Sequence, residues 1–167
     1  MNSPVATHHF QPLDRTPAQG GEPMRVPALL PGTPGRAVVD TTWGTIQPIQ
    51  LHPDVRTVGE LEVIEQLRSG LPLIDTRRPA AFAAGTIPGA RSLPHTELGE
   101  RIGELDPMAP AILFCNGPQC AATPNAIRLL IDRGYPALAL RYYRGGMHDW
   151  VTLGLPIAPG ASSRASH

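Results

Sequence analysis

The sequence contains no lysine, because all 14 of its basic residues are arginines. This absence excludes Schiff-base catalysis, which needs a lysine amine, and a phosphate-binding P-loop, whose motif contains a lysine. The 14 acidic residues balance the arginines, so the formal net charge at pH 7 is zero. Nonspecific attraction to nucleic acid or to an anionic membrane draws on excess positive charge. We therefore expect neither as a partner.

Cysteine is scarce as well, with two residues among 167. Two cysteines do not make a disulfide framework. No apolar run approaches the ~20 residues that a membrane-spanning helix needs. The sequence that follows Met1 also lacks the basic region and apolar stretch of a secretory signal. We therefore expect a cytoplasmic protein, since thiols stay free in that reducing compartment.

Proline and glycine crowd the start of the chain, where residues 1–36 hold seven of the 20 prolines and four of the 17 glycines. These residues show no helical or strand periodicity, which predicts a flexible tail. Residues 37–56 are expected to form an extended lead-in. Ile46–Leu51 within it is an edge strand at most, because it contains Pro48. Residues 159–167 are small and polar, which predicts a frayed end.

Residues 57–158 carry a different pattern, in which short apolar runs alternate with helical ones. The apolar runs predict buried strands at Leu71–Asp75, Ala111–Cys115 and Leu138–Tyr143. The helical patterns are Pro79–Ala84, His95–Leu105, the stretch from the loop at Cys120 to Arg133, and Met147–Leu153. Strands that alternate with helices predict an α/β fold, with a parallel sheet covered on both faces.

A further helix is predicted at the start of this region. Thr57 would cap it, because Glu60 follows three residues later as in a capping box. Leu61, Ile64 and Leu67 come next at a spacing that places them on one helical face. We expect that face to be the apolar face of the helix.

Cys115 is the most informative residue of the chain, since it ends a predicted strand and precedes a loop that opens a helix. In open α/β sheets, ligands bind outside the carboxyl ends of the strands. Free N–H groups and the helix dipole favour an anion at a helix N-terminus. They are expected to lower the pKa of the Cys115 thiol and make it a thiolate nucleophile. The alternative is a buried strand cysteine that acts only as a small hydrophobe.

Three motifs, in order along the chain, resemble those of rhodanese domains. Residues Asp75–Ala90 resemble the signature D-x-R…F/Y…G-H-I-P-G-A of that family. Residues Arg144–Trp150, followed by Gly154–Pro156, resemble its closing motif G-G-x-x-x-W…G-x-P. Between the two, Cys115 occupies the place of the family's sulfur-carrying cysteine. The resemblance covers about residues 57–156.

This resemblance implies a rhodanese-like fold, a central parallel sheet of about five strands with helices on both faces. It also implies a sulfurtransferase. The Cys115 thiolate would take the sulfane sulfur of a small anionic donor such as thiosulfate, and the persulfide would pass it to cyanide or a thiol. A protein could also serve as sulfur donor or acceptor. The resemblance implies neither a metal nor an organic cofactor.

The residues that would bind the anionic persulfide follow from the same resemblance. They are the backbone N–H groups of Asn116, Gly117, Gln119, Cys120 and Ala121. The loop has no basic side chain, so an arginine from elsewhere would have to assist. Arg144, Arg77 and Arg91 are the candidates, in that order. An ion pair with a carboxylate such as Asp75 is the alternative role for these arginines.

Cys120 stands where many loops of the family carry an arginine. One hypothesis makes it a resolving thiol, which attacks the Cys115 persulfide, closes a disulfide and releases sulfide. The alternative is a loop residue whose N–H matters more than its sulfur. A metal site of Cys115, Cys120 and His148 is not favoured, because C-x4-C is not a common zinc spacing.

Two other functions compete with sulfur transfer. A protein phosphatase needs an arginine six residues after its cysteine to clamp the phosphoryl group, and Ala121 stands there. The other is a sulfur carrier or redox-sensing module that a partner protein loads. The sequence leaves the choice between enzyme and carrier open.

Overall fold

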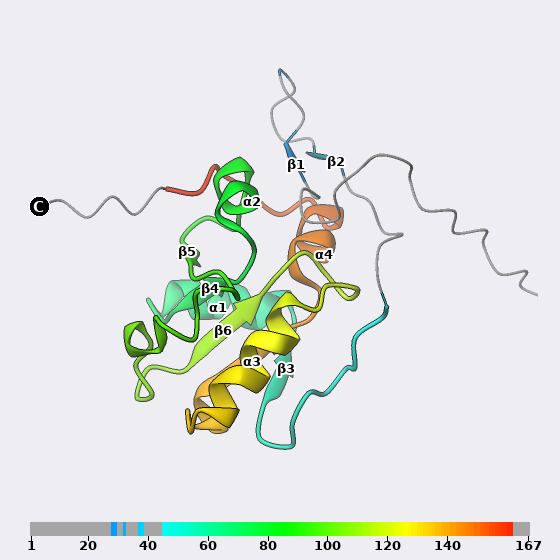
Figure 1. Ribbon diagram of the computed structural model, residues 1–167. Helices are drawn as coiled ribbons and strands as arrows, with labels where there is room; N and C mark the ends of the chain where they lie inside the picture. Colours follow the sequence, from blue (N-terminus) through cyan, green and yellow to red (C-terminus); the bar gives the residue numbers. More distant parts are fainter. Residues whose placement is uncertain (1–27, 30–31, 33–36, 39–44, 162–167) are drawn as a thin grey trace, which may run out of the picture.

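The computed structural model describes residues 28–29, 32, 37–38 and 45–161, and its centre is a five-stranded sheet (Figure 1). The strands are β3 (Arg56–Val58), β4 (Leu73–Asp75), β5 (Arg91–Ser92), β6 (Ala111–Phe114) and β7 (Leu140–Tyr143). Their order in the sheet is β3-β7-β6-β4-β5, and every neighbouring pair is parallel. The predicted α/β fold with a parallel sheet of about five strands is confirmed.

Helices cover both faces of this sheet. They are α1 (Glu60–Arg68), α2 (Pro79–Ala84), α3 (Ala122–Asp132) and α4 (Gly146–Thr152), with short 3-10 turns η2 (Ile102–Glu104) and η3 (Ala137–Ala139). Strand β6 is fully buried, and its side chains alternate between two cores. Leu113 joins the cluster that contains Ile127 of α3. Phe114 joins the cluster that contains Val63 of α1 and Trp150 of α4.

Helix α1 begins later than the sequence predicted. Thr57 belongs to strand β3, and the helix is capped by Gly59. The amide of Gly59 donates to the Glu62 carboxylate over 3.0 Å, so the capping box lies two residues further on. Leu61 was expected on the apolar face but is 80% exposed, whereas Val63 is fully buried. Ile64 and Leu67, the other residues of the predicted face, are partly buried against the cluster that contains Val63, so the buried face is centred on Val63 rather than on Leu61.

One other predicted element is wrong. His95–Leu105 forms turns and η2 rather than an α-helix, although its Leu98 is fully buried. Ile46–Leu51, predicted as an edge strand at most, forms no strand. Its main chain binds other parts of the molecule instead, as described below.

Backbone pairing is present near both ends of the described chain. Strand β1 (Ala28–Leu29), in the predicted tail, pairs antiparallel with β2 (Ala37–Val38), at the start of the predicted lead-in, and the tail lies otherwise outside the described residues except for Gly32. Gly160, in the predicted frayed end, donates its N–H to the Phe82 carbonyl over 3.1 Å.

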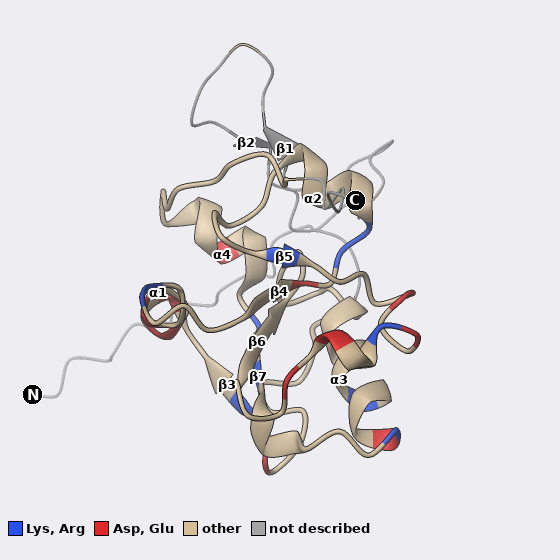
Figure 2. Ribbon diagram, turned by 90° about the vertical axis from the view of Figure 1, so that its left-hand side faces the viewer, with Lys and Arg blue, Asp and Glu red and all other residues tan. Residues whose placement is uncertain are grey.

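Charged residues of both signs are interspersed along the helices and loops of the described chain (Figure 2), as the zero net charge suggests. Across the same residues, no helix has the length and apolar character needed to cross a membrane.

Candidate functional site

Three neighbouring strands end at the same edge of the sheet. The register places Asp75 of β4 opposite Phe114 of β6, and Phe114 opposite Tyr143 of β7. The next residue on β6 is Cys115, and the next on β7 is Arg144. Cys115 and Arg144 therefore leave adjacent strands side by side at the carboxyl edge, where ligands bind in sheets of this kind.

The start of α4 holds the cysteine loop in place. Met147 donates its N–H to the Cys115 carbonyl over 3.0 Å, and His148 donates to the Asn116 carbonyl over 2.7 Å. The glycine before them permits this close approach. Gly146 has a φ of +56°, and a Cβ there would collide with the Cys115 carbonyl oxygen and lie 2.9 Å from the Gly117 nitrogen. The paired glycines of the closing motif thus fit the backbone of the loop.

The loop after Cys115 folds back through a turn. Cys120 donates its N–H to the Gly117 carbonyl over 2.9 Å, with Pro118 and Gln119 at the two central positions. Proline suits the second position of such a turn, because its ring fixes φ. The turn returns Cys120 to Cys115, whose sulfur lies 3.5 Å from the Cys120 carbonyl oxygen.

Both thiols are enclosed. Cys115 and Cys120 are each 2% exposed and form a small buried cluster with Ala122. Neither is in a disulfide. The Cys115 thiol lies 3.5 Å from the Cys120 carbonyl oxygen, and each thiol affects the ionisation of the other, so the two reactive groups of the site lie close together.

Of the two thiols, that of Cys120 has the lower pKa. The hydrogen bond from Cys115 lowers the pKa of the Cys120 thiol to about 7, with help from the amides of Asn116 and Ala122 and from the charge of Arg77. Burial raises the pKa of the Cys115 thiol well above its usual range, as does the hydrogen bond to Cys120. The expectation of a lowered pKa at Cys115 is therefore wrong for the resting pair. The directions of the two shifts favour a thiolate at Cys120, because burial raises the pKa of Cys115 most while hydrogen bonds lower the pKa of Cys120.

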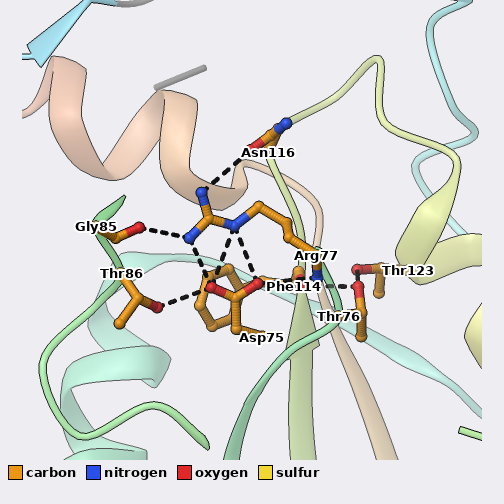
Figure 3. Close-up of polar contacts among 8 residues, drawn as sticks. All are labelled: Asp75, Thr76, Arg77, Gly85, Thr86, Phe114, Asn116 and Thr123. Carbon is orange, nitrogen blue, oxygen red and sulfur yellow. Dashed lines mark hydrogen bonds and ion pairs between the residues drawn. The ribbon is translucent and has the colours of Figure 1, made fainter. Parts of the chain in front are cut away.

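The first turn of α3 supplies donors to both sulfurs, as expected of a helix N-terminus. The Ala122 amide faces Cys120, while the amide and hydroxyl of Thr123 face Cys115. The Thr123 hydroxyl also lies 2.8 Å from that of Thr76, which in turn donates to the Phe114 carbonyl over 3.0 Å (Figure 3). Sequence reasoning missed both threonines, because no motif marks a threonine pair that meets across 47 residues.

Arg77 takes the alternative role, an ion pair, rather than facing an anionic ligand. Its side chain is fully buried and forms an ion pair with Asp75 (Figure 3). Nε donates to Oδ1 over 3.0 Å, and Nη2 donates to Oδ2 over 2.6 Å. It also donates to the Gly85 carbonyl over 2.6 Å and to the Asn116 side-chain oxygen over 3.3 Å. Thr86 donates to the same carboxylate over 2.8 Å. The cluster ties the end of β4 to the first residue of the cysteine loop.

Arg144 lies at the edge of the loop and is held by the main chain. Its Nε and Nη2 donate to the Gln47 carbonyl over 3.0 and 2.9 Å. The Gln47 amide in turn donates to the Pro118 carbonyl over 2.7 Å. No carboxylate in the described part of the chain forms an ion pair with Arg144. Its described partner is therefore a main-chain carbonyl, whereas Arg91 lies on β5 and donates to the Glu104 carbonyl.

Of the five predicted backbone donors, the Asn116 amide faces the sulfur of Cys120, and the Cys120 amide is used inside the turn. Binding of a persulfide by Gly117, Gln119 and Ala121 stays a prediction. Among the described residues, no three His, Cys, Asp or Glu side chains gather as a metal site would require.

Comparison with known proteins identifies the relatives of this chain. The family model described as "Rhodanese-like domain" matches residues 60–153. An HTH-type transcriptional regulator of Mycobacterium tuberculosis is 34% identical over 101 residues, which make up 60% of this chain and 43% of the regulator. A sulfurtransferase of Allochromatium vinosum is 33% identical over 85 residues, 51% of this chain and 76% of that protein. This chain thus spans less than half of the regulator's length.

Solved structures resemble this fold. A thiosulfate sulfurtransferase from Pseudomonas aeruginosa has a TM-score of 0.53 and 26% identity, covering 64% of this chain and 21% of that one. The rhodanese-like domain of an Anabaena protein has a TM-score of 0.53 and 21% identity, covering 66% and 84%. The second likeness concerns the fold alone, and it agrees with the five-stranded parallel sheet.

Proposed function

Because this chain belongs to the rhodanese-like domain family, we propose that it is a sulfurtransferase that carries a sulfane sulfur on Cys115. The observation that carries this proposal is the position of the Cys115 thiol. Cys115 directly follows the central strand β6, its thiol lies in one buried cluster with Cys120, and it faces the amide and hydroxyl of Thr123 in the first turn of α3. This arrangement supplies a nucleophile, a group that can take its proton, and donors for an anionic product.

The first step is the activation of Cys115. The Cys115 thiol shares a buried cluster with the thiol of Cys120, whose pKa is about 7, so Cys115 becomes a thiolate by passing its proton to the Cys120 thiolate. The Cys115 sulfur then attacks the outer sulfur of thiosulfate, the bond between the two donor sulfurs breaks, and sulfite leaves with the bonding pair. Cys115 keeps the transferred sulfur as a persulfide anion. A thiolate or cyanide takes this sulfur in the second step and restores Cys115.

Anions enter and leave the site in both steps, so we also propose that positive charge and N–H groups hold them. The loop amides of Asn116, Gly117, Gln119, Cys120 and Ala121 are the predicted backbone ligands of the persulfide. Arg144 leaves the strand beside Cys115 with no carboxylate partner among the described residues. It is the side chain placed to attract an anionic donor.

The Arg144→Gln variant tests this role. Glutamine can still donate to the Gln47 carbonyl but carries no charge, and a hydrogen bond to a charged group contributes about 1.5–3 kcal/mol. We expect the KM for thiosulfate to rise about tenfold with little change in kcat, which is the signature of lost ground-state binding. Arg91→Gln is the matched control, since Arg91 lies on β5 and should leave KM unchanged. Equal effects in the two variants, or a loss confined to kcat, would argue against anion binding by Arg144.

The proposed function is tested by intact mass after incubation with thiosulfate, in the absence of reductant. The wild type should gain one sulfur, about 32 Da, that cyanide removes, and Cys115→Ser should gain none. Cyanide turnover then measures the complete cycle. A folded protein that gains no sulfur from thiosulfate would contradict thiosulfate as donor, and an adduct that persists in Cys115→Ser would contradict the role of Cys115.

A second candidate is a sulfur carrier or redox module loaded by a partner protein. The burial of both thiols favours it, because at 2% exposure a dissolved donor reaches Cys115 only after the loop moves. The likeness of this chain to one part of a transcriptional regulator also fits a carrier or redox module. Slow loading from small donors together with fast loading from a protein persulfide would indicate the carrier.

A further inference from the structure

Cys120, the second cysteine of the site, lies where its thiol can react with a sulfur bound to Cys115. The chain contains two cysteines in all, and the structure buries both in one cluster. The Cys115 sulfur lies 3.5 Å from the Cys120 carbonyl oxygen, and the turn from Gly117 to Cys120 closes the short loop between them. A sulfur bound to Cys115 would therefore form directly beside a second thiol.

This contact is a consequence of the packing around the loop. On one side, α4 holds the Cys115 and Asn116 carbonyls through its first amides. On the other, α3 begins at Ala122, directly after the turn, and presents its amides to both sulfurs. Both flanks of the loop are therefore anchored, and this packing places the two cysteines next to each other.

We infer that Cys120 is a resolving residue, which converts the Cys115 persulfide into a Cys115–Cys120 disulfide and releases the carried sulfur as hydrogen sulfide. The inference rests on the proposed persulfide at Cys115. It assigns this chain a second outlet for its sulfur, used when no acceptor arrives, and a state in which the cysteine pair is oxidised.

The chemistry balances without an external oxidant. The persulfide anion takes the proton that Cys120 holds after the loading step, which leaves Cys115–S–SH beside a Cys120 thiolate. The thiolate attacks the Cys115 sulfur, the bond to the outer sulfur breaks, and HS⁻ leaves with the bonding pair. The sulfane sulfur is reduced to sulfide while the two cysteine sulfurs are oxidised to the disulfide. A dithiol reductant then returns the pair to its starting state.

The experiment follows the loaded full-length chain in the absence of acceptor. The reduced protein is loaded with thiosulfate, freed of donor under anaerobic conditions, and followed by intact mass and a sulfide assay. In the wild type, the adduct of about 32 Da should give way to a species about 2 Da lighter than the reduced chain, with one sulfide released per chain. Dithiothreitol should restore the reduced mass.

Two variants separate sulfur chemistry from loop packing. Cys120→Ser and Cys120→Ala should both hold the added sulfur at least about tenfold longer than the wild type and never form the lighter species. The agreement of a polar with an apolar replacement would show that the missing sulfur, and not the packing, is the cause. Sulfide release at the wild-type rate in either variant would overturn the inference. Transfer of the added sulfur onto Cys120, found by peptide mapping, would overturn it too.

Failure of the proposed function gives a different pattern. If thiosulfate fails to load the wild type, or loads the wild type but not the Cys120 variants, all proteins are loaded with inorganic polysulfide instead, because polysulfide adds sulfur to a reactive thiol without catalysis. Faster sulfide release by polysulfide-loaded wild type than by Cys120→Ser would support the resolving role even though thiosulfate is not the donor. Equal rates would overturn the resolving role. Absence of any adduct from either donor would overturn both proposals.

Discussion

The Arg77→Met variant is expected to unfold with a free energy about 3–5 kcal/mol below that of the wild type. Arg77 and Asp75 are both fully buried, so the substitution leaves a carboxylate in the interior without its counter-charge. Methionine fills part of the space but donates no hydrogen bond, so the Gly85 carbonyl also loses its partner. A large loss follows because an unpaired buried charge costs far more than the ion pair contributes.

Chemical denaturation monitored by tryptophan fluorescence measures this loss. The matched control is the double variant Asp75→Asn/Arg77→Met, which removes the charge together with its partner. We expect it to recover a large part of the lost stability, because a neutral amide is less costly to bury than a carboxylate. If the double variant were no more stable than Arg77→Met, lost packing rather than unpaired charge would explain the defect.

Substitution of Gly146 by alanine is expected to damage both the fold and the site. The new Cβ would collide with the Cys115 carbonyl, and the φ of +56° is unfavourable for alanine. Relief of the collision requires the cysteine loop to move away from α4. Since a displacement of about 1 Å can reduce a rate by about 100-fold, sulfur transfer should fall by at least that factor.

Gly154→Ala is the matched control for this substitution. Gly154 has a φ of +71°, and a Cβ there would meet no atom within 4 Å. It carries a comparable backbone strain, about 1–2 kcal/mol, without the collision. We expect Gly154→Ala to lose some stability and keep its rate of cyanide turnover. A similar loss of turnover in both variants would mean that strain, and not contact with Cys115, explains the Gly146 effect.

The sequence predicted the centre of the fold better than its edges. Strands β4, β6 and β7 lie within runs of apolar residues, and burial on both faces makes such runs conspicuous. Strand β3 was missed because its Thr57 resembles a helix cap. The three-residue spacing of a capping box fits Thr57 with Glu60 as well as Gly59 with Glu62, so the spacing alone does not fix where the helix begins. Leu138, at the end of an apolar run, is 77% exposed in η3, since hydrophobicity alone does not locate where a strand begins.

The candidate site, like the fold, was predicted only in part. Cys115 was predicted from its place between a strand and a helix, and the Arg77–Asp75 ion pair was weighed as an alternative and is present. The ionisation of the cysteine pair was not predictable, because it depends on which sulfur receives the hydrogen bonds of Asn116 and Ala122. The contact of Arg144 with Gln47 was equally hidden, since it joins two residues 97 positions apart.

That contact bears on how the domain should be delimited. The family match begins at residue 60, whereas Gln47 links the Pro118 carbonyl to the Arg144 guanidinium through its own peptide groups. Such a link depends on backbone atoms, so it tolerates almost any side chain and leaves no signature for a sequence comparison to detect. A fragment cut at the family match would lose both the hydrogen bonds of Gln47 and strand β3. The working unit of this protein is therefore longer than its recognisable motif.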